Sequence, residues 1–130
     1  VNSDGKEIWR TKRKVGRDLP SPIVIGKYLI VVSLRPGIAT CYDVTNGKEL
    51  GRQRLGGNFS ASPIAAGGHA FVPNEDGDVY VLKPTPQGVD VVAVNKLTLR
   101  EPNEIFRSCI TPLSDGRLLI RSTNTLYCVQ

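Results

Sequence analysis

The 130-residue sequence is poor in the residues that most often carry chemistry, with one histidine, three cysteines, one tryptophan and no methionine. A zinc site of the usual kind needs four Cys or His ligands at paired short spacings, and His69 and the cysteines have no such spacing. A Ser-His-Asp triad would have to use His69, but no Gly-x-Ser-x-Gly or comparable nucleophile motif accompanies it. The composition therefore excludes the commonest zinc and serine-hydrolase sites.

Long apolar runs are also missing. No run reaches the roughly 18 residues of a membrane-spanning helix, and no signal peptide is visible at the start. Because methionine is absent and residue 1 is valine, we expect a piece of a longer product. By contrast, glycine and proline are abundant, at 13 and 9 residues, which favours many short elements joined by turns.

Internal repeats organise the chain. Several markers recur with a period near 41, and four-stranded units at this period are the sequence sign of a β-propeller. The third unit carries about eight extra residues, which we place at 100–107. The recurring markers are Ser21-Pro22, Ser62-Pro63 and Thr111-Pro112; Gly26, Gly67 and Gly116; Gly5, Gly47 and Gly88; and Pro36-Gly37 with Asp76-Gly77.

Each unit is expected to form four short strands, because apolar or alternating runs are separated by turn residues. Twelve strands are predicted, which is three blades' worth. They are Lys6–Thr11 alone; Ser21–Ile25, Tyr28–Leu34, Ile38–Asp43 and Lys48–Arg54; Ser62–Ala66, His69–Pro73, Asp78–Lys83 and Gly88–Asn95; and Cys109–Leu113, Leu118–Ser122 and Thr125–Val129.

The predicted fold is all-β, a propeller of four-stranded antiparallel blades with about three blades in this chain. An up-and-down barrel would not repeat every fourth strand, and a β-helix would have a shorter period. The predicted division is a lone outer strand with its linker at 1–18, a blade at 19–59, a blade with an insertion at 60–107, and a blade lacking its outer strand at 108–130. Asn46-Gly47 is expected to form a type I′ turn with Gly47 at positive φ, and Asp76-Gly77 and Asp115-Gly116 likewise.

Two stretches, Asp43–Gly51 and Gly5–Trp9, resemble the repeat core of the PQQ-like (quinoprotein-like) propellers. Gly77–Leu82 and Asn124–Val129 fit the strand that precedes that core in the family. The resemblance implies that Trp9 docks on a peptide of a neighbouring blade. Gly51, and approximately Val94, stand where the family has this tryptophan, so we expect a divergent, loosened copy.

The family has a catalytic and a non-catalytic branch. Quinoprotein dehydrogenases bind a quinone and calcium and carry an adjacent Cys-Cys pair, which is missing here. Residues 74–78 superficially resemble a calcium loop, but Val72 occupies the first ligand position, so a tight turn is expected. The chain looks more like the non-catalytic, BamB-like branch. We therefore predict no catalytic, cofactor-binding or metal-binding residue and no cofactor.

The predicted function is a non-enzymatic protein-binding or scaffolding module, and the resemblance implies an extracytoplasmic (periplasmic or secreted) location. One alternative is part of a quinone-dependent oxidoreductase whose active site lies in other blades. Another is a basic binder of nucleic acid or anionic surfaces, since the net charge is +5 and six cations lie among the first twenty residues. We expect a solvated connection instead, so no specific nucleic-acid partner. The cations are Lys6, Arg10, Lys12, Arg13, Lys14 and Arg17.

Cys41 and Cys128 are expected to be small core residues, and the three cysteines are not expected to form a disulfide framework. Cys41 and Cys128 occupy the same strand position of two blades, where the middle unit has Val81, and an odd count of three argues against pairing. The sequence does not determine the redox state of Cys41, Cys109 or Cys128.

The predicted partners are one or more proteins, among them a second copy of this chain. Three blades are too few to close a ring, since propellers have about four to eight. Both the Lys6–Thr11 strand and the third blade are incomplete, so two copies arranged head to tail would give a six-bladed ring.

Overall fold

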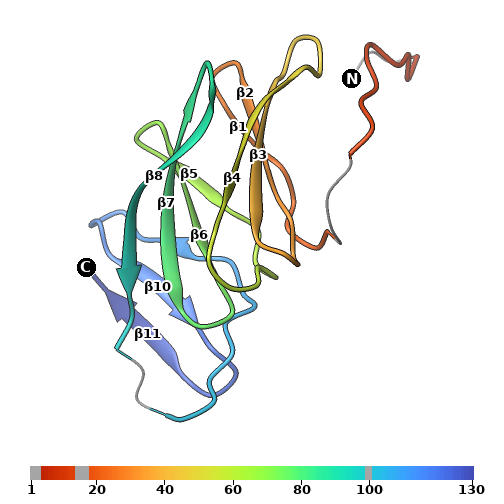
Figure 1. Cartoon of the computed structure of the whole chain (residues 1–130). Coiled ribbons are helices and arrows are strands. Elements are labelled where there is room, and N and C mark those ends of the chain that lie inside the picture. The colour runs from red at the N-terminus through yellow and green to blue at the C-terminus, as the bar shows by residue number, and fades with distance from the viewer. Residues whose placement is uncertain (1–3, 14–17, 99–100) are drawn as a thin grey trace.

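The computed structural model describes residues 4–13, 18–98 and 101–130, and these residues form only strands and turns (Figure 1). Eleven strands build three antiparallel sheets. No helix of the described residues is long and apolar enough to cross a membrane.

The first sheet follows the chain order β1-β2-β3-β4. Its second strand is nearly all apolar, which suits a strand covered on both faces, and its fourth is charged, which suits an outer strand. A β-bulge interrupts the last ladder between Cys41 and Tyr42, so that Cys41 faces Gly51 and Tyr42 faces Glu49. The strands are β1 (Ile23–Ile25), β2 (Tyr28–Val32), β3 (Ile38–Asp43) and β4 (Glu49–Arg54).

The second sheet repeats this plan, including a bulge at the corresponding place between Val81 and Leu82. The third sheet has three strands in the order β11-β10-β9. The strands are β5 (Ile64–Ala66), β6 (His69–Pro73), β7 (Asp78–Thr85) and β8 (Gly88–Lys96), then β9 (Thr111–Pro112), β10 (Leu118–Arg121) and β11 (Leu126–Val129). We call these sheets the first, second and third blades.

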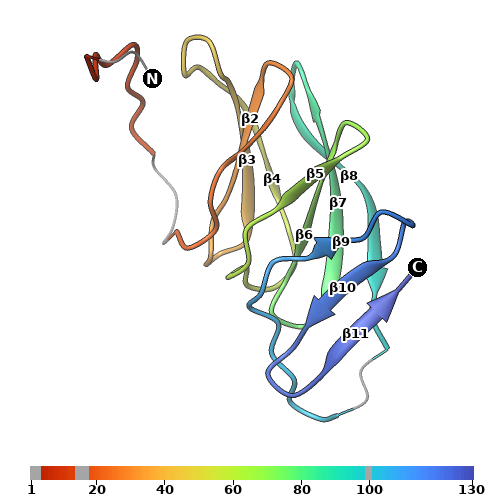
Figure 2. The same cartoon turned by 180° about the vertical axis from the view of Figure 1, so that it is seen from behind.

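The blades stack side by side in chain order (Figures 1 and 2). The core lies between them. One cluster fills the space between the first and second blades, around Ile30, Val32 and Leu82. The other lies between the second and third blades, around Phe106, Ile120 and Tyr127. Because successive side chains of a strand point to opposite faces of the sheet, a blade can present apolar side chains to the blade that it packs against.

The predicted fold class is confirmed: the chain is an all-β propeller segment. Ile38–Asp43 and His69–Pro73 have the predicted bounds, and the other strands of the three blades differ at one or both ends. The strand predicted at Lys6–Thr11 is wrong, because residues 4–13 form no strand. The physical reason is that no strand of the described residues pairs with that segment. The division at 1–18, 19–59, 60–107 and 108–130 stays a prediction.

The predicted turn type is wrong, although its glycines are placed correctly. Gly47, Gly77 and Gly116 all have positive φ, but Asn46 does not, whereas a type I′ turn needs positive φ at both central residues. The loops are longer than two residues: the Gly47 amide donates to Asp43, four residues back. Glycine is still required, since the left-handed conformation is costly for other residues.

Candidate functional site

Three turns and two connections come together at one end of the blades. The turns join β2 to β3, β6 to β7 and β10 to β11, and the connections join β4 to β5 and β8 to β9. We call this surface the turn end and define it by residues 33–37, 55–60, 74–77, 104–107 and 122–125. In antiparallel sheets of the same connectivity these loops must share an end, which is why the repeat brings them together.

Backbone hydrogen bonds between the connections and the turns hold the turn end together. The Phe59 amide donates to Leu34 O at 3.1 Å, and the Glu75 amide donates to Asn58 O at 2.8 Å, so the first connection bonds to the turns on both sides of it. The second connection repeats this pattern, since the Phe106 amide donates to Glu75 O at 2.9 Å and the Thr123 amide to Ile105 O at 3.0 Å. Each connection thereby fixes two neighbouring blades relative to each other.

At each junction, by which we mean the place where a connection bonds to the turns of two neighbouring blades, a phenylalanine packs beneath a turn glycine. Phe59 and Phe106 are fully buried. A Cβ at Gly37 would lie 2.5 Å from the Phe59 ring, and one at Gly77 would lie 2.8 Å from the Phe106 ring. The rings also contact a tyrosine each: Phe59 packs edge-on to Tyr80, and Phe106 lies tilted against Tyr127. These contacts make the turn end rigid.

The acidic segment 74–78 is the tight turn between β6 and β7, as predicted. The buried Asn74 side chain accepts from the amides of Asp76 at 3.1 Å and Asp78 at 2.8 Å, and its amide group donates to Gly56 O at 3.3 Å. Asn74 therefore satisfies the turn from inside, and its oxygen already has two donors. No group of three or more His, Cys, Asp or Glu residues among those described could hold a metal ion.

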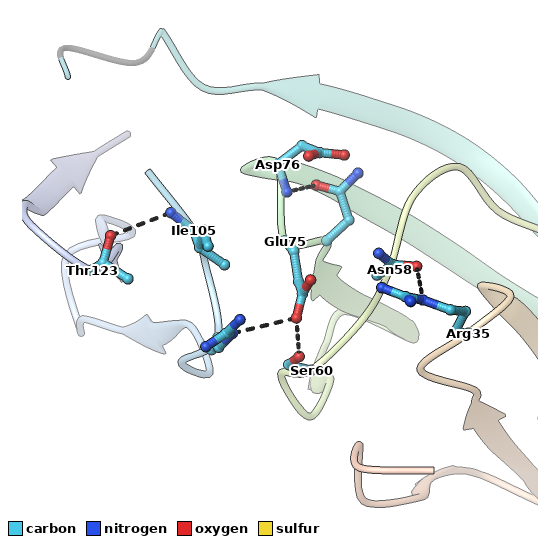
Figure 3. Close-up of polar contacts among 9 residues, drawn as sticks. Arg35, Asn58, Ser60, Glu75, Asp76, Ile105 and Thr123 are labelled. Carbon is cyan, nitrogen blue, oxygen red and sulfur yellow. Dashed lines mark hydrogen bonds and ion pairs between the residues drawn. The ribbon is translucent and has the colours of Figure 1, made fainter. Parts of the chain in front are cut away.

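Charged and polar side chains cross the junctions on the outside (Figure 3). The Glu75 carboxylate accepts from Ser60 Oγ and pairs with Arg107 Nε at 3.4 Å. Arg35 Nε donates to Asn58 Oδ1 at 3.2 Å. The Arg107 side chain is 62% exposed, and Arg35 is exposed too. The turn end thus presents two arginines from different blades on a fixed frame.

Glu104 is a buried carboxylate at the same end. It accepts from the hydroxyls of Ser122 and Tyr127, which lie 18 and 23 residues further along the chain. Burial by itself raises the pKa of Glu104, but hydrogen bonds from Ser122, Thr125 and Tyr127 outweigh it and lower that pKa to about 2. Glu104 therefore holds the third blade in place as an anion.

A groove of about 790 Å³ lies beside β11, between the second and third blades. It is lined largely by apolar side chains, including Phe71, Val79, Leu118 and Val129, and by Lys96 at one side. No strand of the described residues lies on the outer side of β11. The groove therefore borders an unpaired strand edge.

The core role predicted for Cys41 and Cys128 holds for Cys41 and is wrong for Cys128. Cys41 is fully buried, and burial raises its pKa to about 11. Cys128 is exposed on the face of the third blade that points away from the second, since no further blade covers it in the described residues. Cys109 is exposed as well, and all three thiols are free.

Trp9 docks on a turn of the first blade, as the family resemblance implies. Its ring covers Gly47, where a Cβ would lie 2.4 Å from Trp9 Cε3, and its Nε1 donates to Val44 O at 2.9 Å. The expectation of a loosened copy at Gly51 is wrong. A Cβ there would lie 2.2 Å from Gln87 O, so β4 packs backbone to backbone on the next blade's turn.

The basic segment near the start of the chain is partly neutralised by ion pairs. Arg10 pairs with Glu7 and Arg13 pairs with Asp18, while Lys14 and Arg17 lie outside the described residues. These ion pairs reduce the free positive charge at the one place where it is concentrated. The lone histidine, His69, is partly buried on β6, with Nδ1 2.8 Å from Gly67 O.

Sequence reasoning missed the turn end. Its contacts join residues from different repeats, which local patterns do not connect. One signal was present: a phenylalanine precedes Ser62-Pro63 and Thr111-Pro112 by a few residues in each case, at Phe59 and Phe106. An aromatic residue repeated at a connection indicates a repeated packing position.

Comparisons with known proteins agree with this geometry. The family model of the outer membrane protein assembly factor BamB matches residues 1–91. A comparison with curated proteins gives no match. Among solved structures 48 chains match, including BamB from Moraxella catarrhalis, with a TM-score of 0.66 and 19% identity. That match covers 85% of this chain and 33% of the other, so the chain spans about a third of that protein's length.

Proposed function

Since the chain belongs to the PQQ-like propeller family of the outer membrane protein assembly factor BamB, we propose that it is a non-enzymatic module that binds protein partners through its turn end. The relative's name describes assembly of other proteins, which is work done by contact. The observation that carries the proposal is the set of backbone hydrogen bonds by which the two connections hold the turns on both sides of them, at Phe59, Glu75, Phe106 and Thr123. They hold loops of three blades as one preformed surface, and preformed surfaces lose little entropy on binding.

Arg35 and Arg107 are the side chains that we expect to contact a partner. Both are exposed, each comes from a different blade, and each is already oriented by one polar neighbour. Arginine is enriched at the energetically important positions of protein interfaces, because its planar fork donates several hydrogen bonds at once. A partner with carboxylates or exposed backbone carbonyls would fit this surface.

Binding to an unfolded outer-membrane β-barrel protein, diluted from urea and fluorescently labelled, tests the proposal. We expect saturable binding by anisotropy, weakened at least tenfold when Arg35→Glu and Arg107→Glu are combined. Arg117→Glu is the matched control, since Arg117 is exposed in the β9–β10 turn at the opposite end and pairs with Asp115. No binding, or equal loss in the control, would contradict the proposal.

We also propose that the module is extracytoplasmic and that it has no quinone chemistry of its own. Adding the quinone cofactor with calcium should give neither a shifted absorbance nor dye reduction. A quinone-dependent activity of this chain would instead support the oxidoreductase alternative.

A further inference from the structure

Glu75, in the turn between β6 and β7, bonds to both connections of the turn end. Its amide donates to Asn58 O at 2.8 Å, and its carbonyl accepts from the Phe106 amide at 2.9 Å. Its carboxylate oxygen Oε1 bridges the same two connections, since it accepts from Ser60 Oγ and pairs with Arg107 Nε at 3.4 Å. Ser60 and Arg107 each follow a junction phenylalanine directly, so Glu75 links equivalent positions of successive repeats.

The repeat shows that the blades stack without a carboxylate in this place. Leu34 is the equivalent residue of the first blade, where its carbonyl accepts from the Phe59 amide. Thr123 is the equivalent residue of the third blade, where its amide donates to the second connection. Neither side chain is charged, and both junctions form. Stacking therefore does not require the Glu75 carboxylate, which is available for a role at the binding surface.

A continuous row of bonds joins the two exposed arginines through Glu75. Arg35 Nε donates to Asn58 Oδ1 at 3.2 Å. Asn58 O accepts from the Glu75 amide, and the Glu75 carboxylate pairs with Arg107 Nε. Figure 3 shows Arg35, Asn58 and Glu75, which come from three successive segments of the turn end. The row therefore holds the two arginines in a fixed relative position.

Both arginines are held through Nε, which leaves the outer edge of each guanidinium open. In the part of the chain that the structure describes, no hydrogen bond or ion pair of Arg35 or Arg107 uses a terminal Nη nitrogen. The two parallel N–H donors of this edge fit the two oxygens of a carboxylate. The turn end thus presents two carboxylate-binding edges.

An unpaired carboxylate lies between the two arginines in the order of the blades. Asp76 is in the turn of the second blade, whereas Arg35 is in the turn of the first and Arg107 is in the connection that leads to the third. Asp76 is exposed, and none of the described residues donates to its carboxylate. A Cβ at Gly57 would lie 3.0 Å from Asp76 Oδ2, so glycine there keeps the carboxylate accessible. The exposed charges alternate across the turn end, positive, negative, positive.

We propose that the turn end binds an extended protein segment in which a lysine or arginine lies between two carboxylates, and that Glu75 is the positioning residue that directs Arg107 to one of them. Each arginine binds one carboxylate, and Asp76 binds the cation. The inference rests on the proposed function and names the chemistry of the partner. Opposite charges in register favour such a segment, and like charges in register disfavour others.

The spacing of the blades gives the spacing of charges in the segment. Packed sheets lie about 10 Å apart, and about three residues of an extended chain span the same length. A cation three residues from each carboxylate therefore fits Asp76 between Arg35 and Arg107. This pattern is the same in both directions, so it fits whichever way the segment runs across the blades.

Two capped seven-residue peptides of the same composition test the order of charges. One has glutamate at both ends, lysine in the middle and serine elsewhere, and the other has its lysine exchanged with one terminal glutamate. Capping removes the terminal charges, so both peptides have the same net charge. With the full chain at low salt we expect the first peptide to bind about fivefold more tightly by fluorescence anisotropy, because misplaced surface pairs lose small contributions each. Equal binding of both peptides, or binding of neither, would overturn the inference.

Glu75→Gln tests the positioning role, with Arg117→Gln at the opposite end as the matched control. The variant loses the charge that holds Arg107 but keeps an oxygen that Ser60 can reach. We expect about threefold weaker binding of the first peptide, no further loss when Glu75→Gln is added to Arg107→Gln, and no change in the control. Unchanged or tighter binding in Glu75→Gln, or the same loss in the Arg107→Gln background, would overturn the role of Glu75.

The unfolded β-barrel protein is measured separately, so that the two proposals can fail apart. Barrel-protein binding together with equal binding of the two peptides overturns this inference alone. Absence of barrel-protein binding contradicts the proposed function, whatever the peptides do. Circular dichroism shows whether Glu75→Gln is folded. If it is not, the comparison of the two peptides still decides the inference, because it uses the unmodified chain.

Discussion

Gly47 is constrained at the residue scale in two separate ways. Its φ is +71°, and its Cα lies against the Trp9 ring, whereas Gly26 has φ +59° and no atom within 4 Å of the position that a Cβ would take. Gly26→Ala should therefore lower the free energy of unfolding by about 1–2 kcal/mol through backbone strain alone. We expect Gly47→Ala to lower it further, because the new methyl group displaces Trp9.

Denaturant unfolding of both variants measures this difference. Trp9 is the only tryptophan, so its fluorescence reports on the contact directly. The emission should shift to longer wavelength in Gly47→Ala and stay unchanged in Gly26→Ala. Equal stability losses with unchanged emission would show that Trp9 does not rest on Gly47.

Glu104 should make stability depend on pH in the acid range. Its pKa of about 2 in the folded chain lies below its ordinary value of 4.5, so the unfolded chain binds more protons between these pH values. The stabilisation is present above about pH 4.5 and is lost as pH falls towards 2. Urea unfolding at several pH values should show a smaller acid-induced loss in Glu104→Gln than in the unmodified chain. An equal acid-induced loss of stability in the two proteins would contradict the low pKa of Glu104 in the folded chain.

Cys41 should resist thiol reagents that reach Cys109. Burial raises the pKa of Cys41 to about 11, and only the thiolate reacts well. Mass spectrometry after iodoacetamide treatment of the native chain at pH 8 should find Cys109 modified and Cys41 unmodified. Both should react in denaturant, which serves as the control. Modification of Cys41 at a similar rate in the native chain would contradict its place in the core.

At the scale of elements, the sequence predicted all eleven observed strands at least approximately, because period and turn glycines are local signals. It also predicted a strand at Lys6–Thr11, since residue type there matches β4. A strand exists only when another strand pairs with it, and sequence pattern does not show whether the partner is present. Cys128 is exposed for the same reason. The sequence predicted its strand correctly, but in the part of the chain that the structure describes no further blade covers the face of the third blade on which Cys128 lies.

The turn end was not predicted for a related reason. Glu75 contacts Ser60 and Arg107, and Glu104 contacts Ser122 and Tyr127, across sequence separations of 15 to 32 residues. Such pairs depend on how blades stack, which the pattern within one repeat does not encode. The glycine at position 51 is a similar case. The sequence shows that the family's tryptophan is missing there, but only the structure shows that the β4 backbone at Gly51 contacts the backbone of Gln87 in the next blade's turn.

Gly51 should be intolerant of any side chain even though its backbone is not left-handed. A methyl group there would lie 2.2 Å from Gln87 O, so β4 would have to move away from β8. We expect Gly51→Ala to lower the free energy of unfolding by about 1–3 kcal/mol, as overpacking typically does. Arg54→Ala on the same strand, at an exposed position, is the control and should have little effect. A neutral Gly51→Ala would show that the blades stand further apart.

At the scale of the whole molecule, one repeated arrangement accounts for the fold and its binding surface. Each blade contacts the next through an apolar cluster, through a phenylalanine beneath a turn glycine, and through backbone hydrogen bonds at the turn end. In repeat proteins stability is approximately the sum of units and their neighbour contacts. The junctions therefore hold the loops of three blades as a single surface.

Amide hydrogen exchange measures directly whether the connections hold the turns of neighbouring blades together. The amides of Phe59, Glu75, Phe106 and Thr123 lie in connections and turns, outside any strand ladder, and each of their backbone hydrogen bonds joins a connection to the turn of a blade beside it. If the blades stack as described, all four should exchange much more slowly than unstructured amides, by a factor of at least a hundred. Exchange of these four amides at unstructured rates, with the strand amides still protected, would contradict the account.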